Sequence, residues 1–155
     1  MNLNTLVIVA DAARARLLRV IETEEPRARF ALREEGSLVH PEARIKEGER
    51  YSDSFPGGAR ASRNGSAHTL DDHRLAHDAE ERRRFAKSIA EVAAHLVKEQ
   101  ALNPVIVTAT HAMHSVLMGE LSQVLPKQVY VRSELGELSE HSPAQLLHDL
   151  TERGL

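Results

Sequence analysis

The chain of 155 residues contains no cysteine and no tryptophan. Without cysteine it can form no disulfide, thiolate nucleophile or cysteine-ligated zinc site, and it is compatible with a reducing cytoplasm. Aromatic residues make up only 3% of the chain, so RNA or DNA recognition by base stacking is poorly supported. The formal net charge is −3, so any surface that binds anions would have to be local.

Long apolar runs are also missing. No stretch approaches the roughly 20 apolar residues of a membrane span, and residues 1–18 have neither the basic start nor the apolar length of a signal peptide. We therefore expect a cytoplasmic protein. Hydrophobic residues make up 41% of the sequence, which is enough for the core of a domain, and we predict one domain over residues 1–155.

The first part of the chain predicts an antiparallel meander of three strands. Residues 3–10 form a short, β-branched run that is typical of a buried strand. Asp11 begins a polar break, after which arginines alternate with apolar residues over 14–22. A polar turn around Pro26 then leads to a third strand at 28–38.

The last part of the chain alternates helices and strands. We predict a long helix from residue 70 to about 102, with Thr69 as its N-cap. Its apolar face is expected to contain Leu75, Ala79, Phe85, Ile89, Val92, Ala93 and Leu96. Further elements are expected as a strand at 104–110, a helix at 111–125, a strand at 127–132 and a helix that begins at Ser142 and Pro143. This order predicts an α/β fold with a mixed five-stranded sheet, in which helices connect the parallel strands.

Residues 40–68 interrupt this regular pattern with glycines, prolines and charges. A loop of this length inside a domain tends to be functional or disordered, and we expect it to be flexible. Gly57 and Gly58 allow a close approach of the backbone to a ligand, and Arg60 and Arg63 could contact phosphates. The loop matches neither the P-loop nor the dinucleotide-binding glycine pattern, so a solvated connection remains the alternative.

Nine histidines are many for a chain of this length. His68, His73 and His77 flank or enter the long helix, and the last two are four residues apart, a spacing that can place two metal ligands on one helix face. The residues between them lack the glutamate of a zinc-protease motif. We therefore interpret these histidines as solvent-exposed and predict no metal and no cofactor.

Two further groups lie where strands are predicted to end. His111 and His114 begin the helix after the buried strand, a position where ligands bind in open α/β sheets. Asp11, next to Arg14, could hold Mg²⁺ in a hydrolase or nuclease with one of these histidines. The other strand ends supply no convincing carboxylate cluster, so we expect Asp11 to cap the turn between the first two strands. We predict no catalytic residue and retain Asp11, Arg14, His111 and His114 as candidate binding residues.

The run VIVADAARARLLRV at residues 7–20 carries a resemblance to a known family. Together with the third strand, the Gly/Arg loop, the long charged helix and the strand NPVIVTAT, it resembles the bacterial host-attachment protein family. The resemblance covers essentially the full chain and rests on the order of short motifs. It implies a role in attachment to host cells without defining a biochemical activity.

The same order of elements also resembles the middle domain of archaeal and eukaryotic class 1 peptide-chain release factors. That resemblance implies a ribonuclease-H-like fold. In those proteins a Gly-Gly-Gln loop promotes hydrolysis of peptidyl-tRNA, and Gly57, Gly58 and Ala59 stand at its position here without the glutamine. Our first hypothesis is a non-catalytic module that binds the ribosome, tRNA or rRNA through residues 40–68; the second is an indirect role in host attachment through protein partners.

Overall fold

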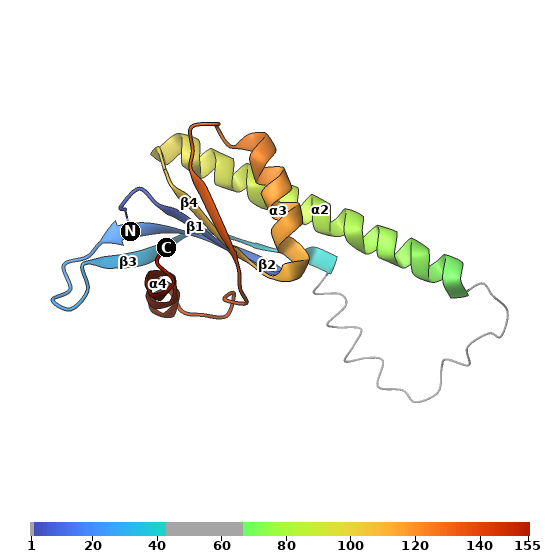
Figure 1. The fold of residues 1–155 in the computed structure, drawn as a ribbon, viewed down its shortest axis with the longest axis horizontal. Helices are drawn as coiled ribbons and strands as arrows, with labels where there is room; N and C mark the ends of the chain where they lie inside the picture. Colours follow the sequence, from blue (N-terminus) through green and yellow to red (C-terminus); the bar gives the residue numbers. More distant parts are fainter. Residues whose placement is uncertain (1, 43–66) are drawn as a thin grey trace, which may run out of the picture.

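Five strands form one mixed sheet in the order β3-β2-β1-β4-β5 (Figure 1). The structure is a computed structural model that describes residues 2–42 and 67–155, except for the side chains of 67–71. Within these ranges the elements are β1 (Leu6–Ala10), β2 (Arg14–Glu22), β3 (Phe30–Val39), α2 (Ala67–Gln100), β4 (Val105–Ala109), α3 (His111–Val124), β5 (Val131–Leu135) and α4 (Pro143–Glu152). The predicted α/β fold with a mixed five-stranded sheet is confirmed.

Strands β1, β2 and β3 form the predicted antiparallel meander. Strand β1 pairs with β2 from Leu6 opposite Arg19 to Ala10 opposite Ala15. In the β2–β3 pair, Leu17 lies opposite Gly36 while Leu18 lies opposite Glu34. Glu35 is therefore the additional residue of a β-bulge, which bends a strand locally.

Strands β1, β4 and β5 run parallel to one another. Leu6 lies opposite Val105 and Ala10 opposite Ala109 in the β1–β4 pair, and all residues of both strands are buried. Such fully apolar strands need cover on both faces of the sheet. Helices α2 and α3 provide this cover on one side and α4 on the other (Figure 1).

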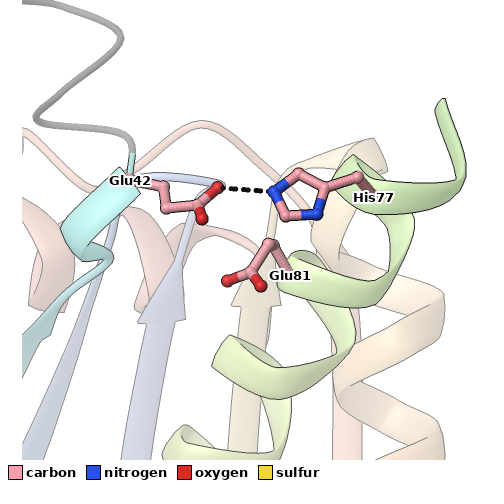
Figure 2. A group of neighbouring side chains, drawn as sticks. All are labelled: Glu42, His77 and Glu81. Carbon is pink, nitrogen blue, oxygen red and sulfur yellow. Dashed lines mark hydrogen bonds and ion pairs between the residues drawn. The ribbon is translucent and has the colours of Figure 1, made fainter. Parts of the chain in front are cut away.

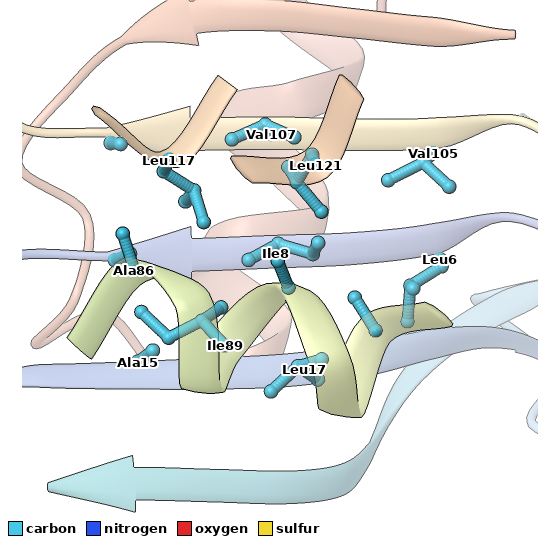
Figure 3. Close-up of a cluster of buried hydrophobic side chains, with 14 of the residues drawn as sticks. Leu6, Ile8, Ala15, Leu17, Ala86, Ile89, Val105, Val107, Leu117 and Leu121 are labelled. Carbon is cyan, nitrogen blue, oxygen red and sulfur yellow. The ribbon is translucent and has the colours of Figure 1, made fainter. Parts of the chain in front are cut away.

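Alternate residues of β1 divide the core into two parts. Leu6 and Ile8 face α2 and α3, where Ile89, Leu117 and Leu121 pack against them (Figure 3). Val7 and Val9 face the opposite side, where Leu146 and Leu150 of α4 are fully buried. This alternation follows from the period of two in a strand.

The ends of the helices agree with the sequence at α4 and differ at α2. The Ser142 side chain accepts a hydrogen bond from the Gln145 backbone N–H, and the Gln145 side-chain oxygen accepts one from the Ser142 backbone N–H. Pro143 is the first helical residue, as predicted. Helix α2, however, already begins at Ala67. Thr69 has helical backbone and is not the N-cap, because an N-cap needs a non-helical backbone.

Several predicted bounds are also corrected. Strand β5 begins at Val131 and not at 127, because only residues 131–135 pair with β4, while Val129 closes a turn on Pro126. Strand β1 begins at Leu6, after a turn in which Thr5 donates to Asn2, and β3 covers Phe30–Val39, the residues that pair with β2. At the ends of the predicted loop, Pro41, Glu42, Ala67 and His68 are helical.

The first turns of α2 do not belong to the core. Leu75 has 68% of its surface exposed and Ala79 is also exposed, although both were predicted on the buried face. This part of α2 extends beyond the sheet, whereas the part from Phe85 to Val97 lies over it (Figure 1). No described helix has the length and apolar character needed to cross a membrane.

Candidate functional site

Asp11 lies in the turn between β1 and β2 and caps it, as predicted. Its Oδ1 atom accepts hydrogen bonds from the backbone N–H groups of Ala13 (2.7 Å) and Arg14 (2.8 Å). The Asp11 backbone N–H donates in turn to the Arg14 carbonyl at 2.9 Å. One of the two oxygens of this carboxylate is therefore used to hold a tight turn.

Arg14 and Arg16 connect β2 with the segment that precedes α4. The Arg14 guanidinium forms ion pairs with Asp11 and with Glu140. Arg16 donates to the carbonyl of His141 at 2.6 Å and also pairs with Glu34. These two arginines thus hold the segment before α4 against strand β2.

The histidines at the start of α3 lie near the carboxyl end of β4, as predicted, but not in contact with Asp11. His111 is the first residue of α3 and is exposed. The Nε2 atom of His114 lies 3.0 Å from Ser133 Oγ on β5. Within residues 2–42 and 67–155, no hydrogen bond or ion pair joins either histidine to Asp11. Of the remaining candidates, Gly57, Gly58, Arg60 and Arg63 lie outside the described residues.

The structure brings together a different group, formed by Glu42, His77 and Glu81 (Figure 2). His77 Nε2 lies 3.3 Å from Glu42 Oε2. One ligand atom from each of the three side chains lies within 4.8 Å of the others. We call these three residues the carboxylate–histidine cluster.

Two elements position the cluster. His77 and Glu81 are four residues apart on α2, so their side chains project from the same face of the helix. Glu42 comes from the chain just after β3, where His40 donates its backbone N–H to the Ala13 carbonyl at 2.8 Å. The His40 ring packs edge-on against Phe85 of α2, with 5.1 Å between ring centres. This contact holds the end of β3 against α2 and places Glu42 beside His77.

The surroundings of Glu81 are partly buried and rich in charge. The Nε2 atom of the buried His40 lies 3.9 Å from Glu81 Oε2. On the solvent side, Arg84 Nη1 lies 3.3 Å from Glu81 Oε1. Glu81 also borders an open cavity of about 270 Å³ whose other lining residues are Leu38, Val39, His40, Pro41, Arg84, Phe85 and Ser88. The cluster therefore lies at the edge of a small hollow between β3 and α2.

The donor set of the cluster suits a cation. One imidazole nitrogen and two carboxylates combine the ligand types of Zn²⁺ and related transition metals. The sequence suggested His73 as the partner of His77, but in the structure His73 is exposed on α2 and the neighbours of His77 in the cluster are Glu42 and Glu81. The spacing of His77 and Glu81 was a usable signal, whereas Glu42 becomes their neighbour only through the packing of β3 against α2.

Comparison with known proteins places the chain in one family. No curated protein matches the sequence. The sequence model of the family described as "Protein required for attachment to host cells" matches residues 6–150, which include all five strands and all but the end of α4. The chain therefore belongs to the host-attachment family.

Proposed function

We propose that this protein is a non-catalytic binding module that contacts RNA of the translation machinery, ribosomal or transfer RNA, through residues 40–68. The observation that carries the non-catalytic part is the bonding of Asp11. Its Oδ1 accepts two backbone hydrogen bonds in the β1–β2 turn. This oxygen therefore holds the turn at the strand end where a nuclease would use the carboxylate to bind Mg²⁺.

The RNA-binding part of the proposal rests on the sequence of residues 40–68 and on the positions of the described residues at the two ends of this segment. Gly57, Gly58, Arg60 and Arg63 combine backbone freedom with phosphate-binding side chains. Glu42, near the start of residues 40–68, contacts His77 of α2, so this contact fixes the start of the segment to the helix that follows it. Ala59 takes the place of the release-factor glutamine, and the proposal therefore contains no peptidyl-tRNA hydrolysis.

The ribonuclease-H-like, release-factor-middle-domain-like classification is part of this proposal. It is supported by the order of elements, in which an antiparallel meander precedes a long helix, a buried strand and a short helix. The proposal also places the protein in the cytoplasm, where ribosomes are found. Recovery of the native protein only from the medium or envelope fractions would contradict that location.

Ribosome co-sedimentation tests the proposal. We expect the double variant Arg60→Glu, Arg63→Glu to lose most of its sedimentation with ribosomes, because two phosphate contacts become repulsive. The matched control is Arg27→Glu, Arg29→Glu, which changes the net charge equally at exposed positions in the β2–β3 turn, at the other end of β3 from Glu42. Equal co-sedimentation of the wild type and both variants would refute the RNA contact.

A second candidate function is an indirect role in host attachment through a protein partner. The exposure of Leu75, at 68% on the part of α2 that extends beyond the sheet, favours it, because apolar residues on an exposed helix face can dock in a groove. A pull-down after ribonuclease treatment separates the two functions. A partner that survives the nuclease and is lost with Leu75→Glu, but not with the Arg60 and Arg63 changes, would favour the protein partner.

A further inference from the structure

The carboxylate–histidine cluster has the composition and geometry of a transition-metal site. Two donors at about 2.1 Å from a tetrahedral ion lie about 3.4 Å apart. The observed distance between His77 Nε2 and Glu42 Oε2 is 3.3 Å. Glu81 completes a set whose atoms lie within 4.8 Å of one another, which is wider than about 3.4 Å, so metal binding requires its side chain to move toward the ion.

The charges around the cluster are compatible with a divalent cation. Two carboxylates balance the charge of the ion, and His77 would bind as the neutral imidazole. Arg84 pairs with Glu81, but its side chain is 66% exposed, and an exposed ion pair of this kind contributes little. A bound cation can therefore replace Arg84 as the partner of Glu81. The buried His40 lies on the other side of Glu81, with 3.9 Å between His40 Nε2 and Glu81 Oε2.

We propose that Glu42, His77 and Glu81 bind a zinc-class divalent transition-metal ion, which links the chain before residues 43–66 to helix α2 after them. Mg²⁺ and Ca²⁺ use oxygen ligands, so the imidazole selects against them. The ion would join residues that are 35 positions apart in the chain. A link of this kind restricts the separation of the two flanks. The proposal goes beyond RNA binding and does not depend on it.

Helix α2 contains its own control for this site. His95 and Glu99 have the same residue types at the same spacing, with 3.2 Å between His95 Nε2 and Glu99 Oε2. Among the described residues, however, no third ligand completes a site there. If a histidine and a glutamate one helical turn apart were sufficient, both pairs would bind metal equally well.

Calorimetric titration of the full, tag-free chain with Zn²⁺ tests the site. We expect 1:1 binding that millimolar Mg²⁺ and Ca²⁺ leave unchanged. The double variant His77→Gln, Glu81→Gln should bind more than about 100-fold more weakly, because loss of an outer-sphere partner alone costs about 10–100-fold. Glu42→Gln should also weaken binding at least 10-fold, and circular dichroism establishes that each variant is folded.

The control double variant His95→Gln, Glu99→Gln should bind Zn²⁺ as the wild type does. Equal losses in the two double variants would show binding by any exposed pair and would overturn the site. Unchanged binding in Glu42→Gln would remove the link between the two flanks, and it would overturn the proposal as well. Absence of Zn²⁺ binding by the wild type would have the same consequence.

Discussion

At the scale of single residues, several charged side chains near the strands serve the structure, among them Asp11, a candidate ligand in the sequence. Asp11 holds the β1–β2 turn, and Arg16 binds the carbonyl of His141 ahead of α4. Glu35, the additional residue of the bulge, accepts two hydrogen bonds from Arg33 at 3.0 and 2.7 Å. These groups contribute to the free energy of folding, and their roles can be measured without knowledge of a partner.

The Asp11 turn gives the first prediction. Asp11→Ala removes the acceptor of two backbone N–H groups and should lower the free energy of unfolding by about 1–2 kcal/mol. Asp11→Asn retains an oxygen at the same position and should cost less than half as much. Urea denaturation measures both values. An alanine variant as stable as the wild type would mean that the two hydrogen bonds do not hold the turn.

Glu35 gives a prediction about pH. The hydrogen bonds from Arg33 lower the pKa of Glu35 below its ordinary value of 4.5, despite its partial burial. A carboxyl whose pKa is lowered by folding stabilises the protein above its unfolded pKa, and this contribution is lost as the pH falls through its folded pKa. Glu35→Gln should therefore reduce the free energy of unfolding by about 1 kcal/mol at pH 7.

The difference between the wild type and Glu35→Gln should decrease below pH 4.5 and vanish once Glu35 is protonated. The control is Glu22→Gln, at an exposed ion pair with Arg29 in the β2–β3 turn, where we expect little effect at any pH. Urea titrations at a series of pH values give these differences. A Glu35→Gln difference that does not change with pH would contradict the interpretation.

At the scale of elements, α2 has two parts with different surroundings. From Phe85 to Val97 it packs on the sheet, with Ile89 fully buried. Its first turns extend beyond the sheet and carry exposed side chains from Asp72 to His77 (Figure 1). The carboxylate–histidine cluster lies where these two parts meet.

Substitutions along α2 should reveal this division. Ile89→Ala leaves a cavity in the core and should lower the free energy of unfolding by about 2–5 kcal/mol. Leu75→Ala, on the same helix, should change it by less than about 0.5 kcal/mol. Urea denaturation of the pair measures the contrast. A large loss in the Leu75 variant would mean that the first turns are packed against another part of the chain.

The sequence predicts elements best where local signals agree. The apolar runs of β1 and β4 and the Ser142–Pro143 helix start indicate their structures directly. Strand β5 was misplaced because its bounds depend on its pairing with β4. Leu75 was misplaced because helical periodicity does not reveal where the sheet beneath a helix ends. In the candidate site, the spacing of His77 and Glu81 is local, whereas Glu42 joins them through tertiary packing alone.

At the scale of the whole molecule, the fold brings the residues that flank positions 43–66 together at one end of the sheet. The chain leaves β3 through His40, which packs against Phe85, and Glu42 then contacts His77 on the helix that follows residues 43–66. With a net charge of −3, the protein as a whole does not attract RNA. The proposed contact therefore depends on local positive charge in the segment between these flanks.

The salt dependence of RNA binding tests this central claim most directly. Fluorescence anisotropy with a labelled ribosomal RNA fragment gives the affinity at each salt concentration, for the wild type, for Arg60→Glu, Arg63→Glu and for the Arg27, Arg29 control. We predict a steep fall in wild-type affinity with salt and a slope reduced by about 1–2 in the Arg60, Arg63 variant, with the control unchanged. The same slope in all three proteins, or no binding at low salt, would contradict the account.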